Sequence, residues 1–573
     1  MLPASRLALV LALMSLPGFL QSGSDAAPPS LVSSVSDNPL GDARILYGKG
    51  DFAGAIATYN KFLEQHPQSP DAYAGLTRIY LKQKNLELAA QAVEKGLAQS
   101  KSPRMHVARG ELWFRQGKIN EAEKEWVDVI NAGYPEARAY LGLARVRDSI
   151  AMYRAAKTMI DKAHNIDPSD PDIEQAWTAT LPLAERIQYL RTALAGDNNW
   201  DAEERENVKN YLDFLAERAK QTTSPCHLAG SLSTAETPLV RLLRDPAHIR
   251  GYGLSVEING RKSSLMLDTG ASGILIKRSI AEHAGISKIT PTKVGGIGDK
   301  GRKDAYFGIA DSIKIGRLEF QNCRVEVMEA RSVAQEDGLI GADVFEDFLV
   351  ELDFPNEKLK LSQLPKRPGE TEHKLTLKSD EEDVGNPYAD QSGAARDPVA
   401  ERGAEQEGSS GDHEKKKIEP APPTESGPQD RYIAPEMQSY THVFRFGHDL
   451  LVPTAIGNVP TKLFLMDTGS LVNFISPAAA REVTKVHGDS DVIVEGLNGR
   501  VAKVYSANKA VLQFGHLRQE NQDITAFDTT AISDDVGTEV SGFLGFVMLR
   551  MLDIKIDYRD ALVDFQFDAK RFR

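Results

Sequence analysis

Two segments of the sequence repeat one arrangement of residue types that can perform acid–base chemistry. Each is an apolar run that ends in aspartate, threonine and glycine: Leu265-Met266-Leu267-Asp268-Thr269-Gly270 and Phe464-Leu465-Met466-Asp467-Thr468-Gly469. Two carboxylates held a few ångströms apart cannot both ionise cheaply, so such a pair shares one proton. The ionised member can draw a proton from water attacking a carbonyl, while the protonated member donates to the developing oxyanion. Together, Asp268 and Asp467 would need neither a metal nor a covalent nucleophile.

Further landmarks follow both aspartates at similar offsets. A glycine-rich stretch that predicts a hairpin comes first, at 294–298 and again at 494–499. An apolar pair before glycine comes next, with Gly341 lying 73 residues after Asp268 and Gly545 lying 78 after Asp467. A single Asp-Thr-Gly could be an ordinary strand-end turn, since aspartate and glycine are common turn residues. Two copies with matched landmarks favour a duplicated domain instead.

These features resemble the retropepsin-type aspartic peptidases, including the bacterial aspartyl-protease-like domains found with tetratricopeptide repeats. The two copies together cover somewhat under half of the chain. The resemblance implies that Asp268 and Asp467 are the catalytic dyad and that other positions support the active-site loops: Thr269, Gly270, Thr468, Gly469, Gly341 and Gly545. It also implies that the glycine-rich hairpins are flaps over the substrate, at Gly295, Gly296, Gly298, Gly496 and Gly499.

In this resemblance the two threonines would hydrogen-bond across the loops, and the glycines after them would allow the tight turn. The sequence departs from the family pattern in two respects. The second copy has Phe546-Val547 where the first has Ala342-Asp343, and neither flap tip offers an obvious tyrosine. Both differences bear on specificity and rate.

The segments that must position the aspartates read as strands. Short β-rich runs with hairpin signals begin near residue 249 and return after residue 438, which predicts two all-β domains at 247–365 and 437–570. Between them, 366–431 is polar and poor in large apolar residues, so we predict a disordered linker there. Pairing within one chain or between two chains would assemble the dyad. We favour pairing within the chain, because a long flexible linker gives a high effective concentration and the two copies have diverged.

A helical repeat precedes the β-domains. Small residues recur every 33 or 34 positions, at Ala55, Ala89, Ala122 and Ala155, each after a related turn. This pattern over 38–170 resembles the tetratricopeptide repeat, and we expect a helical cap at 171–222. The predicted fold is therefore multi-domain: an all-α solenoid followed by two acid-protease-like β-domains that form a pseudo-dimer. The concave face of such an array usually binds a protein or peptide. Alternatively, the helices merely support the next domain.

The N-terminus has the layout of a signal peptide, with one arginine, an apolar block and small residues over 1–27. We expect cleavage between Gln21 and Ala27, export to the periplasm or medium, and no membrane span afterwards. A buried helix is the alternative. Cys226 and Cys323 can form one disulfide or remain two thiols, and no cluster with metal-ligand spacing is evident, so we assign no metal and no cofactor.

Composition narrows the possible functions. The 573 residues carry a net charge of −13, with 41% hydrophobic and 26% charged residues, which is typical of soluble globular protein and argues against a nucleic-acid partner. A serine or cysteine hydrolase is weakly supported, because there is no Gly-x-Ser-x-Gly segment. We predict an aspartic endopeptidase that acts on a polypeptide, with the repeats recruiting a protein or peptide. The alternative is a non-catalytic binding module with a degenerate protease fold.

Overall fold

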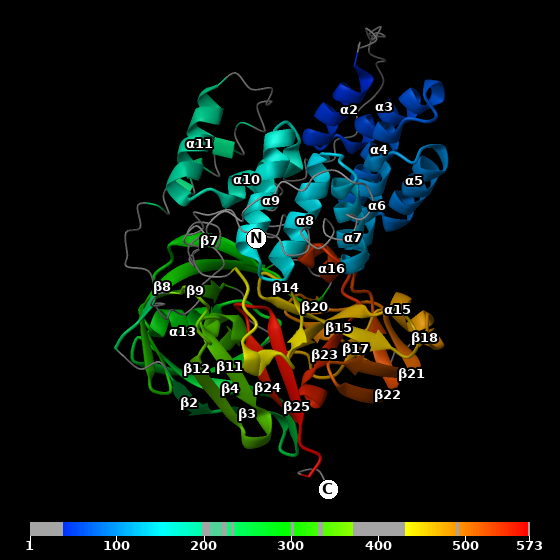
Figure 1. Cartoon of the computed structure of the whole chain (residues 1–573). Helices are drawn as coiled ribbons and strands as arrows, with labels where there is room; N and C mark the ends of the chain where they lie inside the picture. The colour runs from blue at the N-terminus through cyan, green and yellow to red at the C-terminus, as the bar shows by residue number, and fades with distance from the viewer. Residues whose placement is uncertain are drawn as a thin grey trace, which may run out of the picture.

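The structure is a computed structural model of one chain, in which a helical array lies above two β-domains placed side by side (Figure 1). It describes residues 38–196, 226–230, 234–298, 303–329, 336–370, 430–488 and 492–570, together with helical positions between 205 and 219. The predicted signal segment 1–27 and residues 371–429 of the predicted linker lie outside the described residues. Among the described helices, none is long and apolar enough to cross a bilayer.

The array consists of antiparallel helix pairs. Its helices are α2 Pro39–Gly48, α3 Phe52–Gln65, α4 Pro70–Lys82, α5 Leu86–Gln99, α6 Pro103–Arg115, α7 Ile119–Asn131, α8 Ala137–Ser149, α9 Tyr153–Ile166, α10 Pro171–Thr180 and α11 Leu183–Ala195. Side-chain caps such as Asp51, Ser69 and Asn85 accept hydrogen bonds from the first turns and so fix where helices begin. The recurring alanines are fully buried at the helix crossings, which confirms the predicted repeat architecture.

A buried ionic cluster connects alternate helices of the array. Arg138 on α8 donates to Glu111 on α6 at 2.9 Å and to Asp170 and Asp172 at the start of α10 at 2.6 and 2.7 Å. The Tyr47 hydroxyl on α2 donates to Asp172 at 2.6 Å, which links the first described helix to α10. These hydrogen bonds and ion pairs therefore link helices α2, α6, α8 and α10 to one another.

The first β-domain contains a whole nine-stranded sheet, three short helical segments and three further strands. Its elements are β1 His227–Leu228, β2 Ala235–Pro238, β3 Val240–Asp245, β4 His248–Ile258, β5 Arg261–Asp268, β6 Ile274–Lys277, α13 Arg278–His283, β7 Thr290–Val294, β8 Lys303–Ile315, β9 Leu318–Met328, β10 Gly338–Gly341, η1 Ala342–Phe345, β11 Phe348–Asp353, η2 Phe354–Asn356 and β12 Lys358–Gln363. Three of these strands precede the predicted boundary at 247. They are short and mostly exposed or half-buried, so they lack a clear apolar alternation.

The second β-domain repeats this plan around an eight-stranded sheet. Its elements are η3 Pro435–Met437, β13 Thr441–His442, β14 Phe444–Phe446, β15 Asp449–Ile456, β16 Lys462–Asp467, β17 Phe474–Ile475, α15 Pro477–Arg481, β18 Val486–Gly488, β19 Glu495–Gly496, β20 Gly499–Arg500, β21 Val504–Phe514, β22 Leu517–Phe527, α16 Thr530–Val536, β23 Gly542–Gly545, α17 Phe546–Leu549, β24 Leu552–Asp557 and β25 Leu562–Phe567.

A six-stranded sheet joins the two β-domains. Its strand order is β13-β25-β24-β11-β12-β2, so each domain contributes three strands and the junction is the antiparallel pair β11–β24. Val350 on β11 lies opposite Ile556 on β24 in this register, and both side chains are fully buried. One hydrophobic core cluster contains residues from both domains. The predicted pseudo-dimer is therefore formed within one chain.

The two ends of the predicted linker meet at one loop of the second domain. Arg367 donates to the Asp560 carboxylate at 2.6 Å, and Arg431 donates to the Asp560 carbonyl at 2.9 Å. The Tyr432 N–H also donates to the Asp560 carboxylate, at 3.0 Å. Residues at both margins of 366–431 are therefore structured, which the polar composition did not predict.

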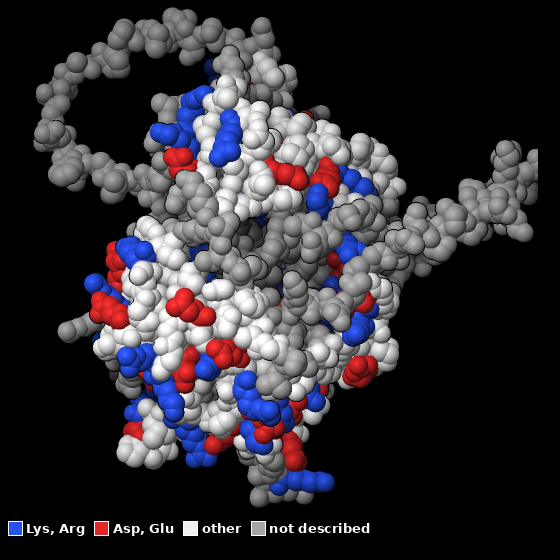
Figure 2. Space-filling model, turned by 90° about the vertical axis from the view of Figure 1, so that its left-hand side faces the viewer, with Lys and Arg blue, Asp and Glu red and all other residues white. Residues whose placement is uncertain are grey.

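Charged side chains of both signs are mixed on one face of the molecule. On the face that Figure 2 shows, Lys and Arg are interspersed with Asp and Glu over the described residues. This part of the surface offers no broad basic area of the kind that phosphate backbones require.

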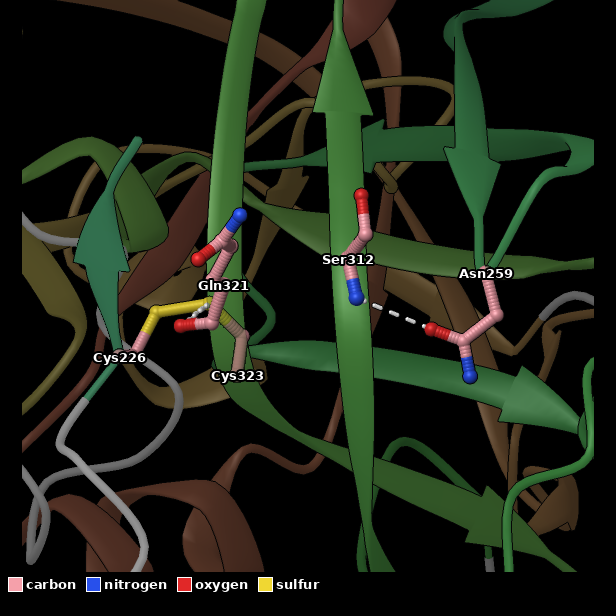
Figure 3. Close-up of a disulfide and its surroundings, with 5 residues drawn as sticks. All are labelled: Cys226, Asn259, Ser312, Gln321 and Cys323. Atoms are coloured by element: carbon pink, nitrogen blue, oxygen red, sulfur yellow. Dashed lines mark hydrogen bonds between the residues drawn. A yellow bond between two sulfur atoms is a disulfide. The ribbon is translucent and has the colours of Figure 1, made fainter. Parts of the chain in front are cut away.

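A disulfide fastens the start of the first β-domain. Cys226, just before β1, is bonded to Cys323 on β9, 97 positions away in sequence (Figure 3). The open question about the two cysteines is thus answered by a disulfide between them. Beside it, the Ser312 N–H donates to Asn259 Oδ1 at 3.0 Å, which connects β8 to the turn after β4.

Replacing both cysteines with serine is expected to lower the free energy of unfolding by about 4 to 5 kcal/mol, because the unfolded chain regains the freedom of a long loop. Urea unfolding of the wild type and of the Cys226→Ser/Cys323→Ser variant measures this. Wild-type protein treated with a reductant should match the variant. Equal stability of all three samples would contradict the expectation.

Candidate active site

The two aspartates occupy equivalent strand ends. Asp268 is the last residue of β5, and β10 runs parallel to β5 with Gly341 opposite Asp268. Asp467 ends β16 in the same way, with Gly545 of the parallel strand β23 opposite it. A Cβ atom at Gly341 or Gly545 would lie 2.4 or 2.2 Å from a carbonyl oxygen of the neighbouring active-site loop, so these positions require glycine. The predicted supporting glycines thus pack against the loops that carry the aspartates.

Reciprocal threonine hydrogen bonds lock the two loops together. The Thr269 N–H donates to Thr468 Oγ1 and the Thr468 N–H donates to Thr269 Oγ1, both at 3.0 Å. Each hydroxyl then donates to a carbonyl of the opposite strand, at Met466 O (2.7 Å) and Leu267 O (3.0 Å). Four buried bonds therefore cross the pseudo-twofold axis directly beneath the aspartates.

The aspartates themselves face each other. The Gly270 N–H donates to Asp268 Oδ1 and the Gly469 N–H donates to Asp467 Oδ1, both at 2.9 Å. A Cβ atom at Gly270 would lie 2.9 Å from the Asp467 carboxyl carbon, and one at Gly469 would lie 2.4 Å from Asp268 Oδ2. Each carboxyl group therefore rests over the opposite glycine, and the structure brings together all four predicted loop residues around the dyad.

The surroundings of Asp268 and Asp467 favour one proton shared between the two carboxyl groups. Burial raises the pKa of Asp467 well above its usual range, and the nearby charge of Asp268 raises it further. Burial also raises the pKa of Asp268, although the Gly270 N–H and a hydrogen bond with Asp467 partly offset this effect. Asp467 is the more buried of the two, at 7% exposure. We therefore place the shared proton on Asp467 and the negative charge on Asp268.

The predicted flaps meet at their tips. The first extends from β7, and the second is the β19–β20 hairpin. At their contact, the Asn498 N–H donates to Ile297 O at 2.9 Å and Asn498 Nδ2 donates to Gly296 O at 2.8 Å. The predicted flap glycines Gly295, Gly296, Gly298, Gly496 and Gly499 lie in these two segments. Asn498 was missed, because Asn-Gly signals only a turn and gives no hint of a bond about 200 residues away in sequence.

Two further polar residues hold the active-site loops, one in each domain. Asp343, which is 1% exposed, accepts from Ser272 Oγ and the Gly273 N–H at 3.1 Å. In the second domain Asn473 Oδ1 accepts from the Gly545 N–H at 2.8 Å. The departure noted at Phe546-Val547 therefore has a replacement: the polar anchor sits on the loop after Asp467 rather than after the glycine.

Acidic residues also gather on the six-stranded sheet, away from the dyad. Oxygen atoms of Glu351, Asp353 and Asp553 lie within 4.8 Å of one another. The Lys360 ammonium bonds both Glu351 and Asp353, the latter at 2.8 Å, so a side-chain cation already fills part of this group. Burial raises the pKa of Asp553 to about 6. We assign no metal to it.

Comparison with known proteins agrees with both halves of the architecture. Residues 254–344 match the aspartyl protease family, and residues 46–112 match the tetratricopeptide repeat family. Curated relatives include the UBA domain-containing protein Mud1 of Schizosaccharomyces pombe, 30% identical over 110 residues, which are 19% of this chain and 32% of that protein. The DNA damage-inducible protein 1 of Neurospora crassa is 32% identical over 108 residues, 18% of this chain and 24% of that one. The matched part is thus at most a third of these relatives.

Solved structures that match parts of the chain include a retropepsin-like aspartic protease from Rickettsia conorii, at 21% identity and TM-score 0.17, covering 23% of this chain and 96% of that one. The aspartic proteinase from Irpex lacteus covers 59% of this chain and 98% of that one, at 11% identity and TM-score 0.31. The tetratricopeptide protein TTC0263 from Thermus thermophilus covers 31% and 97%, at 19% identity and TM-score 0.25. By the sequence matches, residues 254–344 form an aspartyl-protease-type domain, and residues 46–112 belong to tetratricopeptide repeats.

Proposed function

We propose that the chain is an aspartic endopeptidase in which Asp268 and Asp467 activate one water molecule against a peptide bond. The observation that carries this proposal is the dyad itself. Two carboxyl groups are held face to face by reciprocal threonine bonds, and burial with mutual repulsion favours a single shared proton. Two turns with only a structural role would not require two buried carboxyl groups that face each other.

The proton balance of the reaction closes on these two residues. Ionised Asp268 accepts a proton from water as the water oxygen bonds to the carbonyl carbon, and Asp467 donates its proton to the carbonyl oxygen. In the second half, Asp268 gives its proton to the amide nitrogen as the C–N bond breaks, and Asp467 regains a proton from the hydroxyl. An acid and an amine leave, and the dyad again holds one proton.

The other parts of the proposal concern location and recruitment. Export to a periplasm or to the medium is supported by the signal-like segment 1–27 and by the Cys226–Cys323 disulfide, since such bonds persist in oxidising compartments. The substrate is a polypeptide, and the repeat array is proposed to contact a protein or peptide partner.

Incubation of the mature protein with a mixed peptide library between about pH 3 and pH 7, followed by mass spectrometry, tests the proposal. Cleavage that a statine-type transition-state mimic blocks is the expected result, because its hydroxyl takes the place of the attacking water. Peptide binding without turnover at any pH would instead support the non-catalytic binding module.

The pH dependence of kcat/KM is expected to be bell-shaped. Activity falls at low pH as Asp268 becomes protonated, and it falls at higher pH as Asp467 loses the shared proton. Because the pKa of Asp467 is raised, the upper limb lies above the ordinary range of carboxylic acids. Initial rates at constant ionic strength measure this, with circular dichroism as the control for folding at each pH. A rate that keeps rising beyond pH 8 would exclude a carboxyl group as the acid.

A further inference from the structure

One aspartate of the second β-domain, whose side chain is largely buried, bonds the helical array at two of its turns. Asp534 on α16, which is 8% exposed, accepts from Arg115 at the end of α6 at 3.0 Å. Its second oxygen lies 3.0 Å from the Lys84 ammonium in the α4–α5 turn. Asp534 therefore bonds two successive helix pairs of the array at their turns.

Neutral contacts next to this aspartate exclude water. The Thr538 hydroxyl is fully buried and donates to the Phe114 carbonyl at 2.6 Å. The Phe114 ring meets Phe446 of β14 edge-on, with the ring centroids 6.2 Å apart. A second attachment lies in the first turn of α9, where Asp430 accepts from the N–H groups of Arg154 and Ala155 at 3.0 and 2.9 Å. The array is thus held at separated points.

One sheet face of the second domain is apolar and lies against the helical array. Along β16 both faces are apolar: Leu463 and Leu465 are buried, although an exposed sheet face would alternate with polar residues. They belong to the same apolar cluster as Trp126 of the array. In the first domain the residue four positions before the aspartate is Ser264 rather than the equivalent Leu463.

The array lies on the flap side of the peptidase pair. Figure 1 places α7 and α8 above β14 and β20, and α8 contacts β14. Val494, beside the second flap, is a buried member of the cluster that contains Trp126, and Ile297 at the first flap tip packs against that cluster. The flaps therefore have bonded tips and share an apolar cluster with the docked array.

We propose that the docked array keeps the flaps from lifting, so that the peptidase accepts only extended chains that thread lengthwise beneath the joined flap tips. The inference rests on the proposed function and names the class of its substrates. A loop that cannot present a free end must enter from above, which requires the flaps to rise. That motion drives the flaps against the docked array and disrupts the packing of Val494 and Ile297 in the shared cluster.

A matched pair of substrates tests this inference: one linear peptide that is cleaved, and the same sequence closed head to tail. The wild type is expected to cleave the cyclic form at least about tenfold more slowly. Asp534→Lys places a cation against Arg115 and Lys84 and so weakens the attachment of the array to the second domain. It should raise cyclic cleavage about tenfold, while linear cleavage stays within about threefold. Asp128→Lys, at an exposed aspartate that bonds Lys124 within α7, is the matched charge control.

The possible outcomes separate the two proposals. Equal cleavage of both substrates by the wild type overturns the inference and leaves the peptidase intact. A second result overturns the inference as well: the ratio of cyclic to linear cleavage stays the same in Asp534→Lys while hydrogen exchange shows that residues 530–541 are released from the array. Failure to cleave any linear peptide overturns the proposed function and the inference with it. Should Asp534→Lys fail to fold, Asp534→Asn and Thr538→Val weaken the same attachment and receive the same two substrates.

Discussion

Asp268→Asn and Asp467→Asn are each expected to abolish peptide hydrolysis, with kcat falling by about 10² to 10⁴-fold or more, because each carboxyl group performs half of one proton-transfer cycle. Asparagine keeps the size of the side chain, and the Gly270 and Gly469 N–H groups can still donate to its oxygen. The change is therefore confined to the chemistry. Steady-state rates with a cleaved linear peptide measure it, and Asp128→Asn on the array is the exposed control.

These variants also test how the dyad is assembled. Because Asp268 and Asp467 of one chain face each other, both variants should be inactive alone and remain inactive when mixed. Residual activity in each single variant would show that like domains pair between two chains.

Stability provides a readout that is independent of turnover. The pKa of Asp467 is raised in the folded state, so the wild type loses stability as pH rises from the ordinary carboxyl pKa toward the folded value. Each pKa unit of that rise costs about 1.4 kcal/mol. Asp467→Asn carries no proton to lose, so its melting temperature should exceed that of the wild type near neutral pH, but not at low pH.

Gly469→Ala is expected to lower kcat by about 10²-fold without changing either catalytic residue, because a displacement of about 1 Å in a reacting group has effects of that size. The new methyl group would lie 2.4 Å from Asp268 Oδ2, which is closer than real Cβ atoms approach. The carboxyl groups must then move apart, and the shared proton loses its second acceptor.

Gly488→Ala is the matched control for this substitution. A Cβ atom at Gly488 on β18 would meet nothing within 4 Å, so its activity should equal that of the wild type. A crystal structure of Gly469→Ala would show whether the dyad has separated. Full activity in Gly469→Ala would contradict the close packing of the two loops.

The sequence was sufficient to predict those site residues that belong to a short motif present in both domains. An apolar strand that ends in Asp-Thr-Gly appears twice, and the later apolar-apolar-Gly element repeats at a similar offset, so Asp268, Asp467, Gly341 and Gly545 could be selected together. The resemblance implied that these glycines support the active-site loops. The strand register agrees, because β10 and β23 place each glycine beside its aspartate.

The features that were missed depend on contacts between distant segments. Asn498 looks like a turn residue until its partner at Gly296 is known, and Asp534 looks like one acidic residue in a short helix until the array is docked. The strands before residue 247 escaped because β2 and β3 gain stability from pairing with β12 and β4 rather than from an apolar pattern of their own. Tertiary pairing commonly overrides such weak local signals.

Both margins of the predicted linker bond to Asp560, so the segment between them begins and ends at the same place on the second domain. Since Arg367 and Tyr432 bind the same carboxylate, the chain leaves and re-enters the fold at nearly one point. The number of residues between them does not set the spacing of the β-domains, which the six-stranded sheet fixes instead. Evolution or an engineer can therefore lengthen, shorten or replace that segment, or place new chain ends there, without disturbing the geometry of the dyad.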